Sequence, residues 1–177
     1  MSSRVGSSVQ EATRPAEILV LGLQAEPVRR FVEVLCGHIT FAKDRFLLGT
    51  SLLEDRFRLL VYGVQVPDPV DQLALDLVAE RMVGTILLYP WDDPDAHERV
   101  EALADWYEQR FQAPLVVAAF GVSGDPLPGT LQREGLHLSP TGRLVGLDLS
   151  SPRSVVGAVL VLLAVAAERV ADLAGFE

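Results

Sequence analysis

Cysteine is almost absent from this sequence, which limits the kinds of site that the protein can contain. One cysteine, Cys36, rules out an internal disulfide and any zinc site built from several thiolates. It lies in an apolar pattern with helical spacing, which favours a buried structural thiol over a reactive one. The histidines, His38, His97 and His137, are scattered along the chain. We therefore expect no metal site.

Basic charge is also scarce. The chain has 15 Lys and Arg residues against 24 Asp and Glu residues, for a formal net charge of −9. Nucleic-acid phosphates are bound by clustered basic side chains, whereas the basic residues here form only local pairs such as Arg29 and Arg30. A nucleic-acid partner is therefore not expected.

Apolar runs of membrane-spanning length are missing as well. The longest run, residues 155–167, is too short to cross a bilayer and ends at Glu168 and Arg169. We interpret it as a buried helix and expect no membrane partner. Residues 1–15 lack the apolar core of a signal peptide, so they are predicted to form a flexible N-terminal tail of a cytoplasmic protein.

The remaining chain, residues 16–177, has the length and composition of one globular domain. Apolar residues make up 49% of the 177 residues, enough for a substantial core. Buried strands are predicted at 17–22, 84–91 and 114–121, and a final strand at 143–149. A β-hairpin is predicted at 45–53 and 56–64, and helices at 26–37, 70–83, 92–111 and from Pro152 after a Ser150 or Ser151 cap. This alternation predicts an α/β fold with helices on both faces of a mostly parallel six-stranded sheet, which has one antiparallel edge strand.

The order of these elements resembles that of a Ras-like small GTPase. The stretch "LLVYGVQVPDPVDQLALDLVAERMVGTILLYPWDD" resembles the strand that leads into switch II, with the helix and strand after it. "PLVVAAFGVSGD" is similar to the strand before the guanine-reading motif, and "LVGLDLSSPRSVVGAVLVLL" to the last strand and helix. The nearest resemblance is to bacterial MglA-like small GTPases that associate with roadblock proteins. It implies a three-layer P-loop GTPase-like fold.

The phosphate-binding loop of that family has lost its chemistry in this chain. The motif G-x-x-x-x-G-K-[ST] cradles phosphates with backbone N–H groups, a lysine and a magnesium-binding hydroxyl. Counting from Gly22, the second glycine falls on Pro27, the lysine on Val28 and the hydroxyl on Arg29. Proline offers no N–H, valine no charge, and Glu26 would repel a phosphate. Pro27 and Val28 are hypothesised to fill space that a nucleotide would otherwise occupy.

The other nucleotide motifs have changed in the same way. Tyr62 or Gly63 stands at the switch II carboxylate, and Gln65 or Val66 at its glycine. Thr40 is the one candidate for the switch I threonine, on an unusually short connection between the first helix and the second strand. The four guanine-reading positions are occupied by Gly121, Val122, Ser123 and Gly124, with Asp125 one residue late, and "LSS" replaces the serine-alanine motif.

These losses predict a pseudo-GTPase without catalytic residues, cofactor or metal, and no GTPase activity is expected. Its role would be protein–protein contact or regulation, with a roadblock-type partner implied by the resemblance or with a second copy of the chain. The expected partner surface comprises Gln24, Glu26, Pro27, Val64, Gln65, Val66 and Pro67, which lie at two strand ends.

Two alternatives stay open at this point. Backbone groups of residues 22–28 could cradle a phosphate without lysine, which would make the protein an unorthodox nucleotide-dependent switch. An unrelated α/β enzyme would need polar residues clustered at the carboxyl ends of the strands. Among the predicted strand ends Gly22, Tyr62, Tyr89 with Pro90, Gly121 and Asp148, only the last is a carboxylate.

Overall fold

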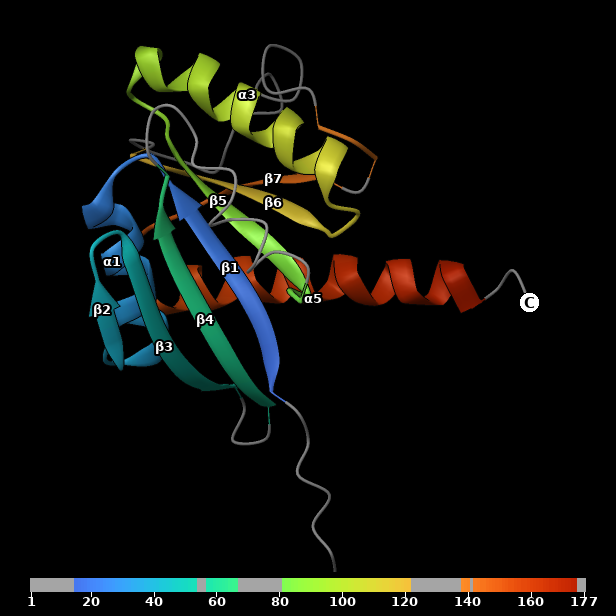
Figure 1. Ribbon diagram of the computed structural model, residues 1–177, viewed down its shortest axis with the longest axis horizontal. Helices are drawn as coiled ribbons and strands as arrows, with labels where there is room; N and C mark the ends of the chain where they lie inside the picture. The colour runs from blue at the N-terminus through green and yellow to red at the C-terminus, as the bar shows by residue number, and fades with distance from the viewer. Residues whose placement is uncertain (1–14, 54–56, 67–80, 122–137, 141, 175–177) are drawn as a thin grey trace, which may run out of the picture.

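The computed structural model describes residues 15–53, 57–66, 81–121, 138–140 and 142–174. Its strands are β1 (Ala16–Gly22), β2 (Phe41–Lys43), β3 (Phe46–Leu53), β4 (Phe57–Gln65), β5 (Gly84–Pro90), β6 (Leu115–Phe120) and β7 (Arg143–Gly146). Its helices are α1 (Ala25–Cys36), α3 (Pro94–Arg110) and α5 (Pro152–Ala174). The strands form one sheet in the order β2-β3-β4-β1-β5-β6-β7, with helices on both faces (Figure 1).

The sheet is parallel through its centre and antiparallel at one edge. β1 lies parallel to both β4 and β5, and β6 lies parallel to β5 and β7. β3 runs antiparallel to β4, and β2 antiparallel to β3. The predicted hairpin and buried strands are thus confirmed, and β3 alone runs opposite to the other described strands. A six-stranded sheet with the antiparallel strand at its edge is wrong, because the described chain forms seven strands and β2 lies outside β3.

The additional strand is β2, which a tight turn folds back onto β3. Lys43 pairs with Phe46 across this turn, and Asp44 adopts a φ of 52°, in the left-handed region that aspartate tolerates better than most residues. All three β2 residues are exposed. Because no buried side alternates with an exposed one, the sequence carries no strand pattern here.

Helices α1 and α5 cover one face of the sheet. The buried residues of α1 are Val28, Phe31, Val32 and Leu35, the positions predicted from helical spacing. They pack with the β1 residues Ile18 and Val20 in one core cluster, which also contains the buried side of α5. This packing positions the start of α1 against the ends of β1 and β4.

Helix α3 covers the opposite face (Figure 1). Asp93 caps its start, accepting a hydrogen bond from the Asp95 backbone N–H at 3.1 Å. The helix predicted at residues 92–111 is therefore confirmed. Of the helix predicted at 70–83, residues 70–80 lie outside the described part of the chain, and residues 81–83 lead into β5 without helical structure.

A buried hydrogen bond ties α3 to β5. The Thr85 hydroxyl donates to the Tyr107 hydroxyl at 2.8 Å, and both side chains are almost inaccessible, at 0% and 1% exposure. Burial raises the pKa of Tyr107 to about 12, so its phenol stays protonated at neutral pH.

Tyr107→Phe is expected to lower the free energy of unfolding by about 1 to 3 kcal/mol, because the buried Thr85 hydroxyl loses its partner. Adding Thr85→Val in the same chain should recover most of that loss, since neither group is then left unsatisfied. Urea denaturation of the two variants measures both values. Equal destabilisation in the single and double variants would contradict this account.

Helix α5 begins at a serine cap and extends beyond the apolar run that predicted it. The Ser151 hydroxyl accepts from the Ser154 backbone N–H at 3.3 Å, which selects Ser151 from the two predicted caps. The helix has 23 residues, and its buried positions lie on one side: Val155, Ala158, Val159, Leu162 and Val165. The interpretation of this segment as a buried helix is therefore correct for that side only, because the described residues leave the other side exposed.

Candidate functional site

The carboxyl ends of β1 and β4 bring together the two segments predicted as a partner surface. Gly22 pairs with Gln65 in the parallel register. The Val66 backbone N–H donates to the Gly22 carbonyl at 2.9 Å, and the Gln65 amide nitrogen lies 3.5 Å from the Leu23 carbonyl. The turn before α1 and the end of β4 therefore form one continuous edge.

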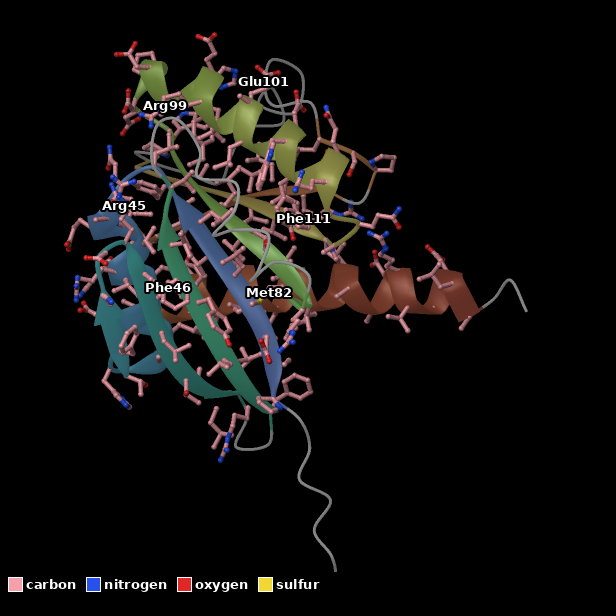
Figure 2. The ribbon with its side chains drawn as sticks, viewed as in Figure 1. Arg45, Phe46, Met82, Arg99, Glu101 and Phe111 are labelled. Atoms are coloured by element: carbon pink, nitrogen blue, oxygen red, sulfur yellow. The ribbon has the colours of Figure 1, made fainter. Side chains whose placement is uncertain are left out.

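The β2–β3 turn joins this edge, which the sequence analysis did not anticipate. The Gln65 backbone N–H donates to the Arg45 carbonyl at 3.0 Å, so the turn is fixed beside β4. Arg45 is exposed, and Figure 2 places it at the α1 end of the molecule. The sequence signal was "KDRF", a short polar turn between two β-favouring runs.

The predicted partner residues differ in how accessible they are. Gln24 and Glu26 are exposed, and Pro27, Val64 and Gln65 are partly exposed. Val66 is only 2% exposed, so assigning its side chain to the surface was wrong. It packs in the core cluster beneath α3, because the chain continues the line of β4 past its last residue. Pro67 lies outside the described residues.

The start of α1 has few of the donors that bind a phosphate at a helix N-terminus. Gln24 is the N-cap and its side chain makes no capping hydrogen bond, while Glu26 places a carboxylate in the first turn. Pro27, also in the first turn, has no N–H. Arg29 lies 3.7 Å from Glu33 in an exposed ion pair along the helix. A surface ion pair thus accounts for Arg29.

Gly22 is required by packing at this turn. A Cβ atom at Gly22 would lie 2.6 Å from Val28 Cγ2, and one at Gly63 would lie 2.9 Å from Val28 Cγ1. Val28 is 1% exposed, and these two contacts place its side chain between the ends of β1 and β4. The glycine that begins the loop allows the helix to sit close to the sheet, whether or not an anion is present.

A narrow crevice remains beside the turn. The crevice there encloses no volume that a water molecule could occupy. It is lined by Gly22, Leu23, Gln24, Pro27, Leu88, Pro90 and Phe120. Apolar side chains and two proline rings thus occupy the edge where β1, β5 and β6 end.

Gly22→Ala is expected to lower the free energy of unfolding by about 1 to 3 kcal/mol, because the new methyl overlaps Val28. Valine is branched at Cβ and cannot rotate out of contact easily. Urea denaturation measures the change. In a Val28→Ala background the same glycine substitution should be nearly neutral, and a cost that persists unchanged there would refute the contact as its cause.

The switch I candidate, Thr40, lies apart from the Gly22 turn. The Thr40 backbone N–H donates to the Leu48 carbonyl at 2.8 Å, and Leu48 pairs with Tyr62, which pairs with Leu19 in the middle of β1. At about 4.8 Å per strand, Thr40 is roughly 14 Å across the sheet from β1. Thr40 therefore cannot act together with the Gly22 turn. Residues 37–40 alone connect α1 to β2.

Tyr62 is a partly exposed aromatic residue at one of the two candidate carboxylate positions. Its ring contacts Phe46 edge to face, with centroids 5.8 Å apart. Partial burial, together with Glu17, raises the pKa of Tyr62, so the phenol is neutral at physiological pH. It offers no negative charge to a cation.

At the far end of the same edge, Asp148 is engaged in a turn. Its carboxylate accepts from the Ser150 backbone N–H at 2.8 Å and from the Ser150 hydroxyl at 2.6 Å, and these bonds lower its pKa. The carboxylate thus organises the entry to α5. Gly121 has a φ of 83°, and residues 122–125 of the guanine-reading stretch lie outside the described residues.

A second polar pair missed in the sequence lies near β5. The Tyr89 hydroxyl and His97 Nδ1 are 2.8 Å apart, and the Tyr89 ring contacts Trp91 with centroids 5.4 Å apart. Burial, with Asp93 nearby, raises the pKa of Tyr89. The pair connects the start of α3 to the end of β5, and the Tyr89 side chain also packs with the buried residues of α3 in one core cluster.

Comparison with solved structures identifies the architecture. The chain is similar to nucleolar GTP-binding protein 1 of Plasmodium falciparum, with a TM-score of 0.67, 7% identity and 92% of each chain covered. It is also similar to the Arl6 BBS3 small GTPase of Trypanosoma brucei, solved with the nucleotide analogue GppNp, with a TM-score of 0.64, 11% identity, and 88% of this chain and 99% of that one covered. No protein-family model and no curated protein sequence matches the chain. The fold is therefore that of the Ras-like P-loop GTPases.

Proposed function

We propose that this protein is a pseudo-GTPase: it uses a small-GTPase fold as a protein-interaction module and neither binds nor hydrolyses a guanine nucleotide. The closed turn at the start of α1 carries the proposal. Val28 and Pro27 stand at the lysine and second-glycine positions of the phosphate loop, Val28 is buried against the sheet, and the crevice beside Pro27 has no room for water. A phosphate group is larger than a water molecule.

The electrostatics of the turn support the same conclusion. Phosphate sites combine converging N–H donors with positive charge. Here the first turn of α1 carries the Glu26 carboxylate, and Arg29 is directed along the helix toward Glu33. The net charge of −9 adds a general repulsion of polyanionic nucleotides.

Thermal unfolding with GTP, GDP or ATP, each with and without Mg²⁺, tests the absence of nucleotide binding. A ligand present at 100 times its Kd stabilises a protein by about 2.7 kcal/mol, or roughly 5 to 10 °C for a chain of this size. We expect no shift at 0.1 mM nucleotide (on the order of 100 times a micromolar Kd). Isothermal titration should likewise release no binding heat.

Glu26→Gln sharpens that test. If a nucleotide does bind at this turn, removal of the carboxylate raises its affinity, so the variant exposes weak binding that the parent chain hides. We expect the variant to remain as unresponsive as the parent. Micromolar binding by either chain would favour the alternative, a nucleotide-dependent switch that relies on the backbone of residues 22–28.

The proposed partner surface is the edge formed by Gln24, Glu26, Pro27, Val64 and Gln65, with Arg45 added by the structure. By the resemblance to MglA-like proteins, the proposed partner is a roadblock-type protein. The surface mixes half-exposed apolar groups with polar ones and has both signs of charge, which suits a protein partner better than a lipid or nucleic acid.

A purified roadblock-type protein from the same organism tests this assignment by titration. Glu26→Arg should weaken its binding at least about tenfold if the edge is the interface. Asp105→Arg makes the same charge change on an exposed position of α3, so it serves as the matched control and should leave the affinity unchanged. Equal effects of the two variants would exclude the edge as the interface.

A further inference from the structure

Between residues 155 and 167, helix α5 is apolar on its outer side as well as its inner side, yet the described residues cover only the inner side. By length and composition the 23-residue helix could cross a membrane, so the expectation that this segment is too short to do so was wrong, because the helix extends beyond the apolar run at both ends. Of its most apolar window of 18 residues, 28% is buried. A helix that is apolar on every side is ordinarily enclosed by protein or lipid. The outer side of α5 therefore calls for a covering partner.

The uncovered side forms a single stripe of large and small residues. Leu160 is 50% exposed, and Ala164, Ala167 and Ala171 follow it at helical spacing and are also exposed. Arg153 lies on this stripe at the start of the helix, and Asp172 lies beside its other end. We call these residues the α5 stripe.

The last turns of α5 run past the sheet (Figure 1). Val170 and Leu173 are 67% and 68% exposed there. A groove of about 620 Å³ follows the helix, lined in part by Phe57, Leu160 and Ala167. Another of about 690 Å³, lined in part by Met82, Phe111 and Leu173, lies along the same turns, and Figure 2 labels the first two of these residues.

We propose that the α5 stripe is a homodimer interface, in which the α5 helices of two copies pack antiparallel across a twofold axis. A twofold contact requires a surface complementary to itself. The stripe meets that requirement, because the large side chain of Leu160 can lie against the small Ala164 of the other copy, and the same happens a second time by symmetry.

The charged residues of the α5 stripe and its apolar contact indicate nearly the same position for the twofold axis. In an antiparallel pair, two residues of the helix face each other across the copies when the twofold axis passes midway between them. For Leu160 and Ala164 this midpoint is residue 162, and for Arg153 and Asp172 it lies half a residue further along the helix. Half a residue is about 0.75 Å along a helix. One antiparallel arrangement thus sets Leu160 against Ala164 and Arg153 against Asp172, with two interchain ion pairs.

A lipid surface fits the same stripe less well. The net charge of −9 and the carboxylates of Glu168 and Asp172 oppose binding to anionic lipids. In addition, Val155, Val159 and Leu162 on the inner side of α5 are packed into the core of the domain. The helix cannot enter a bilayer without unfolding that core.

Sedimentation equilibrium of the full chain tests the dimer. At micromolar concentrations we expect twice the monomer mass of 19.2 kDa. Leu160→Arg should raise the dimer Kd at least about 100-fold, because it places two charges at an apolar contact. The matched control is Leu52→Arg, at a leucine 56% exposed on β3, whose side chain points away from the groove that its neighbour Leu53 lines. It should leave the Kd unchanged.

A charge exchange decides the orientation, and it remains decisive if Leu160→Arg fails to fold. Arg153→Asp or Asp172→Arg alone should raise the dimer Kd about tenfold, and the double variant should restore it to within about threefold. A monomeric parent chain at 100 µM (about 100 times the expected Kd range), or no recovery in the double variant, would overturn the proposal. So would a monomer that binds phosphatidylcholine or phosphatidylglycerol vesicles.

Discussion

Phe31→Ala is expected to lower the free energy of unfolding by about 3 to 5 kcal/mol, the range found for aromatic side chains removed from tightly packed cores. Phe31 is 0% exposed and is the largest side chain that α1 places against the sheet. The helix contacts β1, β3, β4 and α5, so the resulting cavity would loosen several elements together. Urea denaturation monitored by circular dichroism gives the value.

Phe41→Ala is the matched control for this prediction. It deletes the same side chain from β2, where Phe41 is 49% exposed. Its effect should stay within about 0.5 kcal/mol. A similar loss in the two variants would indicate that α1 is not fixed to the sheet by the contact described here, and the partner surface at the helix start would then have no rigid support.

The sequence predicted most of the fold because the core pattern is strong. The α1 positions Val28, Phe31, Val32 and Leu35 repeat at helical spacing, and the structure buries all four. The strands β1 and β5 are continuous apolar runs, as expected of strands covered on both faces. The sequence did not predict β2, because all three of its residues are exposed and show no strand pattern, although its backbone pairs with β3.

The candidate site was predictable in its location but not in its detail. Strand ends in a parallel sheet meet at one edge, so Gly22 and Gln65 could be expected near each other. The burial of Val66 depends on the direction in which the chain continues after β4. The position of Arg45 at this edge depends on the hydrogen bond between the β2–β3 turn and Gln65. Both are tertiary contacts, which local spacing does not encode.

Glycines placed beneath α1 explain why a phosphate-loop turn persists without phosphate chemistry. Added Cβ atoms at Gly49 and Gly63 would each lie 2.9 Å from a Val32 methyl group, and one at Gly22 would lie closer still to Val28. Together these glycines let α1 approach the sheet closely. Selection on core packing therefore suffices to retain Gly22. A lysine at position 28 or a threonine at position 29, as in the phosphate-loop motif, would not contribute to that packing.

Gly84→Ala is expected to cost about 3 kcal/mol, at the upper end of the range for overpacking. The added Cβ would lie 2.6 Å from Leu162 Cδ1 and 2.9 Å from the Pro114 carbonyl oxygen, which already accepts a hydrogen bond from the Thr85 N–H at 2.9 Å. A side chain can rotate away, but this carbonyl is fixed in the sheet. Leu162→Ala should therefore relieve only part of the Gly84→Ala cost, whereas Val28→Ala relieves nearly all of the Gly22→Ala cost. Urea denaturation of the two double-mutant cycles compares these two costs. If Leu162→Ala removed the whole cost of Gly84→Ala, the Pro114 carbonyl would have to move easily, which would contradict the rigid sheet backbone assumed here.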